Sequence, residues 1–206
     1  MTNAPSIIIP TNDGFAVQEN RTGGFIAGRI LKFSEGRYRL DKEDFNPGST
    51  ELVATGMFTV WVRWQDRKPI EHKVTPDGGC HPDREELGDL DEERWELGLN
   101  GEPNDPWKDT RYLRFIDRKN GAEYTFITDA LGGLRAVADL KGQIANIRSA
   151  HPGARAVVQL GSTSWKTRFG MKLRPQFHVV DWVNGAAAGE QLQLIPGPGE
   201  PDDPWE

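Results

Sequence analysis

The alternation of apolar and polar residues over Lys172–Val183 is the feature that most constrains the fold of this chain. Apolar residues share one parity: Leu173, Phe177, Val179 and Val183. Polar and basic residues, with one tryptophan, share the other: Lys172, Arg174, Gln176, His178 and Trp182. Because successive side chains of a strand point to opposite faces, this stretch predicts a half-buried strand.

Two other regions show the same kind of pattern. In Leu52–Trp64, alternate positions including Val60 and Val62 are apolar, which predicts a strand with Trp61 and Arg63 on its outer face. The Asn120-Gly121 pair lies between two apolar runs, 111–117 and 122–128, and predicts a tight hairpin.

A single helix is predicted after this hairpin. Asp129 can cap its start, and His151-Pro152-Gly153 ends it after about Ser149. Its apolar stripe is predicted at helical spacing: Leu134, Val137, Ala138, Ile144 and Ile147. A strand over 154–161 and a turn at Ser162-Thr163 follow. The chain is therefore predicted to be mainly β with one helix, as an OB-like partly closed antiparallel barrel; a β-sandwich with one packed helix is the alternative.

Composition shifts divide the chain into three parts. Turn clusters predict a flexible N-terminal arm over 1–22. A single β-rich domain is predicted over 23–184, with an acidic insertion at 81–108. Glycine, proline and acidic residues predict a disordered acidic C-terminal tail over 185–206.

The charge distribution matters more than the net charge of −6. Acidic residues concentrate in 83–105 and 190–206, and the remainder of the chain is mildly basic. The one cysteine, Cys80, rules out an intramolecular disulfide framework. No apolar run approaches the length of a membrane helix. A soluble protein of the cytoplasm, with no membrane partner, is expected.

Basic and aromatic residues recur together on the predicted outer faces of these strands. An unpaired nucleic acid strand requires cations for its phosphates and rings on which its bases stack. The candidate nucleic-acid-binding residues are Trp61, Arg63, Trp165, Lys166, Arg168, Lys172, Arg174, His178 and Trp182. A strand with an ordinary solvated outer face accounts for the same pattern without any ligand.

The C-terminal residues carry a second candidate surface, formed by Asp202, Asp203, Trp205 and Glu206. Acidic residues followed by a near-terminal aromatic resemble the tails of single-stranded-DNA-binding proteins. That resemblance implies a tail that recruits replication or recombination proteins and competes with DNA for the basic groove. Glu206 departs from it, because the tails of that family usually end on the aromatic residue.

The stretch 164–183 is also similar to the last barrel strands of phage-encoded OB-fold single-stranded-DNA-binding proteins. Those strands combine an aromatic and basic segment, a glycine and a long alternating strand ahead of an acidic tail. The whole chain looks like proteins of tailed phages and prophages. The resemblance implies binding of single-stranded DNA in phage DNA replication or recombination, in the host cytoplasm.

The sequence contains little evidence of an enzyme. It has no phosphate-binding loop of the Gly-x-x-x-x-Gly-Lys-Ser/Thr type and no Gly-x-Ser-x-Gly elbow. Cys80 and His81 are too few for a structural zinc site. A non-enzymatic protein without cofactor or metal is expected. Two alternatives stay open: a phage structural or interaction protein without nucleic-acid binding, and a metal-dependent nuclease using Asp66, Glu71 and Lys73. The sequence also leaves a homo-oligomer open.

Overall fold

Strand β4 (Glu51–Gln65) organises the fold, because three other strands pair with it in the computed structural model. The structure describes residues 24–75, 80–98, 101–167, 170–184 and 193–194. β6 pairs with β4 over most of its length, on one edge. On the other edge, β8 pairs with the start of β4 and β5 pairs with its end.

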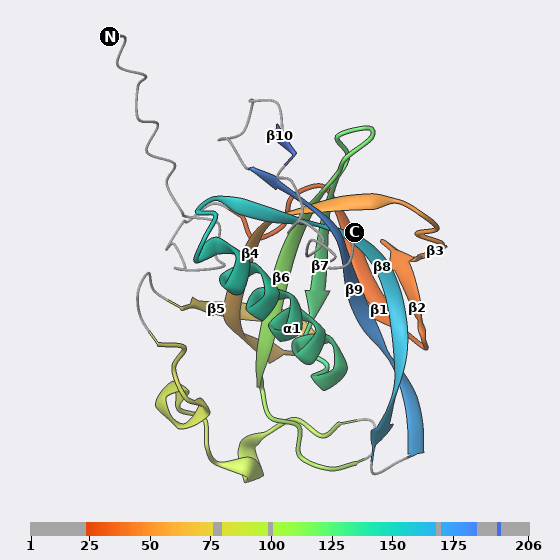
Figure 1. Cartoon of the computed structure of the whole chain (residues 1–206). Coiled ribbons are helices and arrows are strands. Elements are labelled where there is room, and N and C mark those ends of the chain that lie inside the picture. Colours follow the sequence, from red (N-terminus) through yellow and green to blue (C-terminus); the bar gives the residue numbers. More distant parts are fainter. Residues whose placement is uncertain (1–23, 76–79, 99–100, 168–169, 185–192, 195–206) are drawn as a thin grey trace, which may run out of the picture.

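All ten strands belong to one sheet, in the order β10-β9-β8-β4-β6-β7-β1-β2-β3, with β5 beside β4 (Figure 1). Neighbouring strands are antiparallel except β1 and β7, which are parallel. Their bounds are β1 (Arg29–Ser34), β2 (Arg37–Leu40), β3 (Glu43–Phe45), β5 (Lys68–Val74), β6 (Trp107–Asp117), β7 (Glu123–Thr128), β8 (Ala154–Thr167), β9 (Gly170–Asn184) and β10 (Gln193–Leu194).

The sheet curls on itself: eight of its strands turn through 235° into a half-barrel. Of the residues that the structure describes, 54% lie in strands and one segment is helical, as the sequence predicts for an OB-like partly closed barrel. Tyr38 bridges the two ends of the curled sheet. Its hydroxyl lies 2.9 Å from the carbonyl oxygen of Gly161 in β8 and 3.3 Å from that of Gln176 in β9. This buried contact joins β2 to the β8–β9 hairpin, and we call the line where they meet the seam.

Helix α1 (Leu131–Arg148) packs across one face of the sheet, beside β9 (Figure 1). Its buried side chains are Ala136, Val137, Leu140 and Ile144, which join the main core with residues of β1, β2, β4, β6, β7, β8 and β9. The helix begins one residue later than predicted, after Ala130. Ala138 is exposed, so its predicted place in the apolar stripe is wrong, and Leu140 takes that role.

The β8–β9 hairpin differs from its prediction in two ways. β8 continues through Ser162-Thr163 to Thr167, so the predicted turn is absent there and Trp165 lies on β8. In β9 the register shifts near Val180: Val158 faces Val179, while Val157 faces Asp181. This bulge inserts one residue, which moves every later side chain to the other face. Phe177 and Val183, predicted on one face, therefore belong to two different cores.

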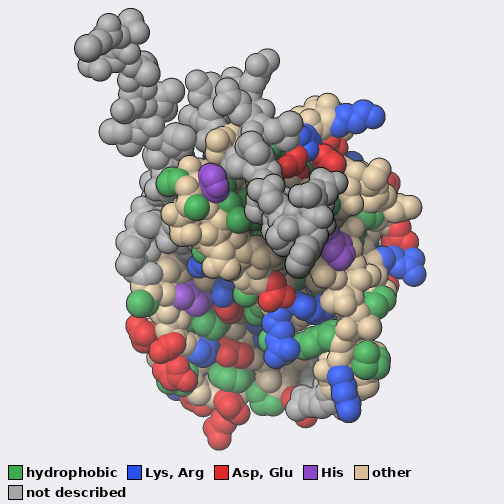
Figure 2. All heavy atoms as spheres, viewed as in Figure 1, with side chains coloured by type: hydrophobic (Ala, Val, Ile, Leu, Met, Phe, Trp, Pro, Cys, Tyr) green, Lys and Arg blue, Asp and Glu red, His purple; other side chains and the backbone are tan. Residues whose placement is uncertain are grey.

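The acidic insertion contains two short 3₁₀ helices, η1 (Arg84–Leu87) and η2 (Glu92–Arg94), and ends where β6 begins. Figure 2 shows its acidic side chains gathered at the lower left of the molecule. The predicted N-terminal arm lies outside the described residues. Of the predicted tail, only Gln193–Leu194 is described, and it forms β10 against the end of β9. No helix in the described ranges has the length and apolar character needed to cross a membrane.

Candidate nucleic-acid interface

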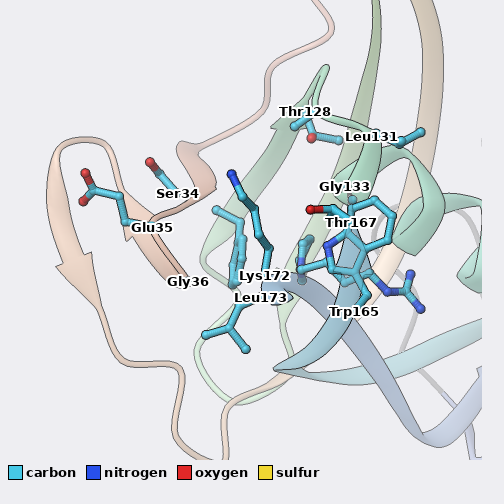
Figure 3. A pocket seen from close by; sticks show the side chains of 15 residues that line it. Ser34, Glu35, Gly36, Thr128, Leu131, Gly133, Trp165, Thr167, Lys172 and Leu173 are labelled. Carbon is cyan, nitrogen blue, oxygen red and sulfur yellow. The ribbon is translucent and has the colours of Figure 1, made fainter. Parts of the chain in front are cut away.

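A groove of about 950 Å³ opens between three elements: the β1–β2 turn, the first turn of α1 and the β8–β9 hairpin. We call it the hairpin groove. Three of the residues predicted to bind nucleic acid line it, namely Trp165, Lys172 and Arg174. Figure 3 shows Trp165 and Lys172 projecting from the hairpin, with Glu35 and Gly36 on the opposite side and Leu131 above. The pairing of β8 with β9 places Trp165 opposite Lys172 and thereby brings these residues together.

Trp165 is fixed by the start of α1. The guanidinium carbon of Arg135 lies 4.9 Å from the centre of the indole ring, a cation–π contact. A Cβ atom at Gly132 would lie 3.6 Å from Trp165 Cζ2 and 2.9 Å from Arg174 Cβ, so the helix backbone comes very close to both strands. Arg135 occupies one face of the indole and leaves at most one face for a stacked base. Sequence reasoning did not place Arg135 at the site, because only the fold brings α1 to the hairpin.

The groove is surrounded mainly by basic side chains, together with some acidic ones. Arg174 pairs with Asp139 of α1, at 2.9 Å between Nη1 and Oδ2, and its side chain is 22% exposed. Lys172 is exposed at the rim, and Glu35, on the opposite wall, pairs with Arg39. Arg135, Lys172 and Arg174 thus bring three positive charges to the site, and Glu35 and Asp139 bring two negative ones. Such a balance suits an anionic ligand that also offers flat apolar surface.

Apolar side chains at the mouth of the groove are unusually exposed. Leu131 is 57% exposed and Leu173 is 51% exposed, and both line the groove. Met171, two residues before Leu173 on β9, is 65% exposed. Large apolar side chains that gather around a concave surface commonly mark a binding site. No sequence pattern pointed to Leu131, because the predicted apolar stripe of the helix begins at Leu134.

Trp61 and Arg63 lie away from this groove, under the acidic insertion. The indole nitrogen of Trp61 donates to the carbonyl oxygen of Pro82 at 2.8 Å, and its ring stacks on His81 with 5.2 Å between centres. Arg63 pairs with Asp89 at 2.8 Å. The sequence predicts Trp61 and Arg63 on an open outer face of β4. That prediction is wrong for both residues, because the acidic insertion folds back over them.

Trp182 is also displaced from its predicted position. The bulge near Val180 turns its side chain toward the main core, against which it packs half-buried. His178, before the bulge, stays exposed and lies over Gly161, where a Cβ atom would come within 2.5 Å of its Nε2. Lys166 is exposed near the tip of the hairpin. Arg168 and the tail residues Asp202, Asp203, Trp205 and Glu206 lie outside the described residues.

A chain of polar contacts links the insertion to the sheet, and the sequence did not reveal it. Nδ1 of His81 lies 2.7 Å from Thr75 Oγ1, and its Nε2 lies 3.1 Å from Asp109 Oδ1. Burial raises the pKa of Asp109, but hydrogen bonds from His81 and Arg111 outweigh burial and hold that pKa below its ordinary value. The Thr75 hydroxyl is buried and lies 3.3 Å from the carbonyl oxygen of Thr59. This network holds the insertion in place.

The residues considered for a nuclease lie on the β4–β5 hairpin. Lys73 Nζ is 3.9 Å from Glu71 Oε1, and the backbone N–H of Asp66 donates to Glu96 Oε1 at 2.8 Å. Within the described ranges, no group of three or more His, Cys, Asp or Glu side chains is placed to hold a metal ion.

Comparisons of the chain with family models, with curated proteins and with solved structures gave no match.

Proposed function

We propose that the protein binds single-stranded DNA in the hairpin groove and does so without catalysis. The observation that carries this proposal is the convergence of Trp165, Lys172 and Arg174, drawn from two strands, on one groove of about 950 Å³. Such a site provides what an unpaired strand needs: an aromatic face for a base and cations for the flanking phosphates. Trp61, Arg63 and Trp182 are not part of the proposed interface, because they are covered or half-buried.

The proposal includes a biological setting. Binding of single-stranded DNA would serve phage DNA replication or recombination, and the acidic tail with Trp205 would recruit a partner protein. The support for this part is the resemblance of 164–183 and of the tail to phage-encoded single-stranded-DNA-binding proteins.

Fluorescence anisotropy with a labelled thymidine oligonucleotide tests the proposal. Trp165→Ala should weaken binding by about 1–3 kcal/mol, or roughly 5- to 150-fold, the usual effect of removing one base–aromatic stack. Trp64→Ala is the matched control, since Trp64 is 39% exposed and does not line the groove. A duplex of the same sequence should bind more weakly, because its bases are already stacked.

Two results would contradict the proposal. If the wild-type protein shows no salt-dependent binding of the oligonucleotide, single-stranded DNA is not its ligand. If the protein binds but Trp165→Ala and Trp64→Ala behave alike, the hairpin groove is not the interface.

A further inference from the structure

A second, smaller hollow lies beside the hairpin groove, along the seam. It has a volume of about 430 Å³ and lies between β2, the β3 end and β8. We call it the seam hollow. Among the residues that line it are Phe33, Gly36, Arg37, Phe45 and Gly161. Tyr38, whose hydroxyl bridges the seam, also borders it.

The two depressions are adjacent. Phe33 and Gly36 line both of them, so the two depressions border each other at the β1–β2 turn. Gly36 has a φ of 81°, and a Cβ atom there would lie 2.8 Å from Cδ1 of Leu173. A side chain at position 36 would therefore crowd Leu173, which lines the hairpin groove, and the positive φ also favours glycine there.

The lining of the seam hollow suits a nucleotide. Phe45 is half-buried, and its ring centre lies 6.2 Å from that of Tyr124, so the ring is held by the sheet. Arg37 is 59% exposed and pairs with Asp44 at 2.7 Å. Surface ion pairs of this kind contribute little to stability, so the guanidinium can exchange the carboxylate for a phosphate at small cost.

From this adjacency we infer that the unpaired DNA strand bound in the hairpin groove continues across the seam, with a following nucleotide in the seam hollow. Phe45 would contact the base and Arg37 the phosphate. This inference rests on the proposed function and extends it, because it assigns the site a second nucleotide-binding position and a path for the strand.

The test is a series of labelled thymidine oligonucleotides of increasing length, measured with wild-type protein and with Arg37→Gln. Arg37→Gln should leave the affinity for the shortest binding oligonucleotides unchanged and should reduce the affinity for longer ones by about threefold or more at low salt. For the longer oligonucleotides the slope of log affinity against log salt should also become shallower by about 0.7, the effect of one phosphate contact.

Arg29→Gln is a closely matched control. Arg29 pairs with Asp41 at 2.9 Å and is 55% exposed, so its environment resembles that of Arg37, but it lines neither depression. A second variant, Phe45→Ala, probes the base contact. Its folding can be checked by circular dichroism, and Arg37→Gln gives an independent result if that variant does not fold.

The outcomes separate the inference from the proposed function. If Arg37→Gln and Arg29→Gln bind every oligonucleotide as the wild type does, while Trp165→Ala binds all of them weakly, the second position is refuted and the proposed function stands. If a single thymidine nucleotide binds as tightly as the longest oligonucleotide, the strand has no extended path and the inference is also refuted. If no oligonucleotide binds to the wild type, both fail together.

Discussion

Two glycines of α1 give opposite predictions for the same substitution. A Cβ atom at Gly133 would lie 2.0 Å from Thr128 Oγ1 and 2.8 Å from Thr128 Cβ, and both residues are buried. A Cβ atom at Gly142 would meet nothing within 4 Å. Replacing glycine by alanine inside an exposed helix stabilises it by about 0.8–1.0 kcal/mol. Overpacking a buried contact costs about 1–3 kcal/mol, which outweighs that gain.

Gly142→Ala should therefore raise the melting temperature by about 2–4 °C, and Gly133→Ala should lower it by several degrees, as expected for a chain of this length. Urea denaturation followed by circular dichroism provides the free energies of unfolding. Because Thr128 and Gly133 both line the hairpin groove, Gly133→Ala should also weaken oligonucleotide binding, whereas Gly142→Ala should not.

A double variant tests the cause. Thr128→Ala removes the hydroxyl and the methyl group nearest to the new Cβ atom, so it should recover part of the stability lost in Gly133→Ala. Equal stability of Gly133→Ala and Gly142→Ala would refute the close approach of α1 to the end of β7.

Three further predictions concern charge. Replacing Lys172 and Arg174 by glutamine should make the slope of log affinity against log salt shallower by roughly 1–1.5, and Lys68→Gln should leave it unchanged. Asp109 has a lowered pKa in the folded state, so its stabilising effect is full above about pH 4 and is lost as the pH falls through the folded-state pKa. Urea unfolding should therefore show a wild-type advantage over Asp109→Asn that shrinks as the pH falls below 4, and a constant difference would contradict this. Deletion of 197–206 should tighten oligonucleotide binding at low salt and have little effect at high salt, where screening weakens an acidic competitor; weaker binding after the deletion would refute competition by the tail.

Local sequence signals predicted most of the elements correctly. The Asn120-Gly121 turn joins β6 and β7 as expected, because its geometry depends on residues within the turn itself: Gly121 has a φ of 73°, and Asp117 Oδ1 accepts from the N–H groups of Lys119 and Asn120. The class of the fold follows from the same local patterns, since a run of strands with one helix closes into few architectures.

The sequence-based predictions are wrong where one inserted residue, or a segment distant along the chain, determines which side chains are buried. The bulge near Val180 moves Trp182 to the core face, and the alternation of residue types up to Val179 gives no sign of it. Trp61 is covered by residues some 20 positions later in the chain, whose path over the sheet has no local signature. Trp165 and Lys172 were predicted in one segment and do face each other across the β8–β9 hairpin, but the contact of Trp165 with Arg135 depends on where α1 packs.

The Tyr38 bridge across the seam has a consequence for the order in which the protein folds. Its hydroxyl contacts residues 123 and 138 positions away along the chain, and contacts of such separation require the closure of long loops. During synthesis, β1 and β2 leave the ribosome long before β8 and β9 exist. The β6–β7 hairpin and α1 can form from neighbouring residues alone, but both walls of the hairpin groove come together only when the last long strand has been made. The binding surface is thus completed at the end of folding, and a chain truncated before β9 would lack it.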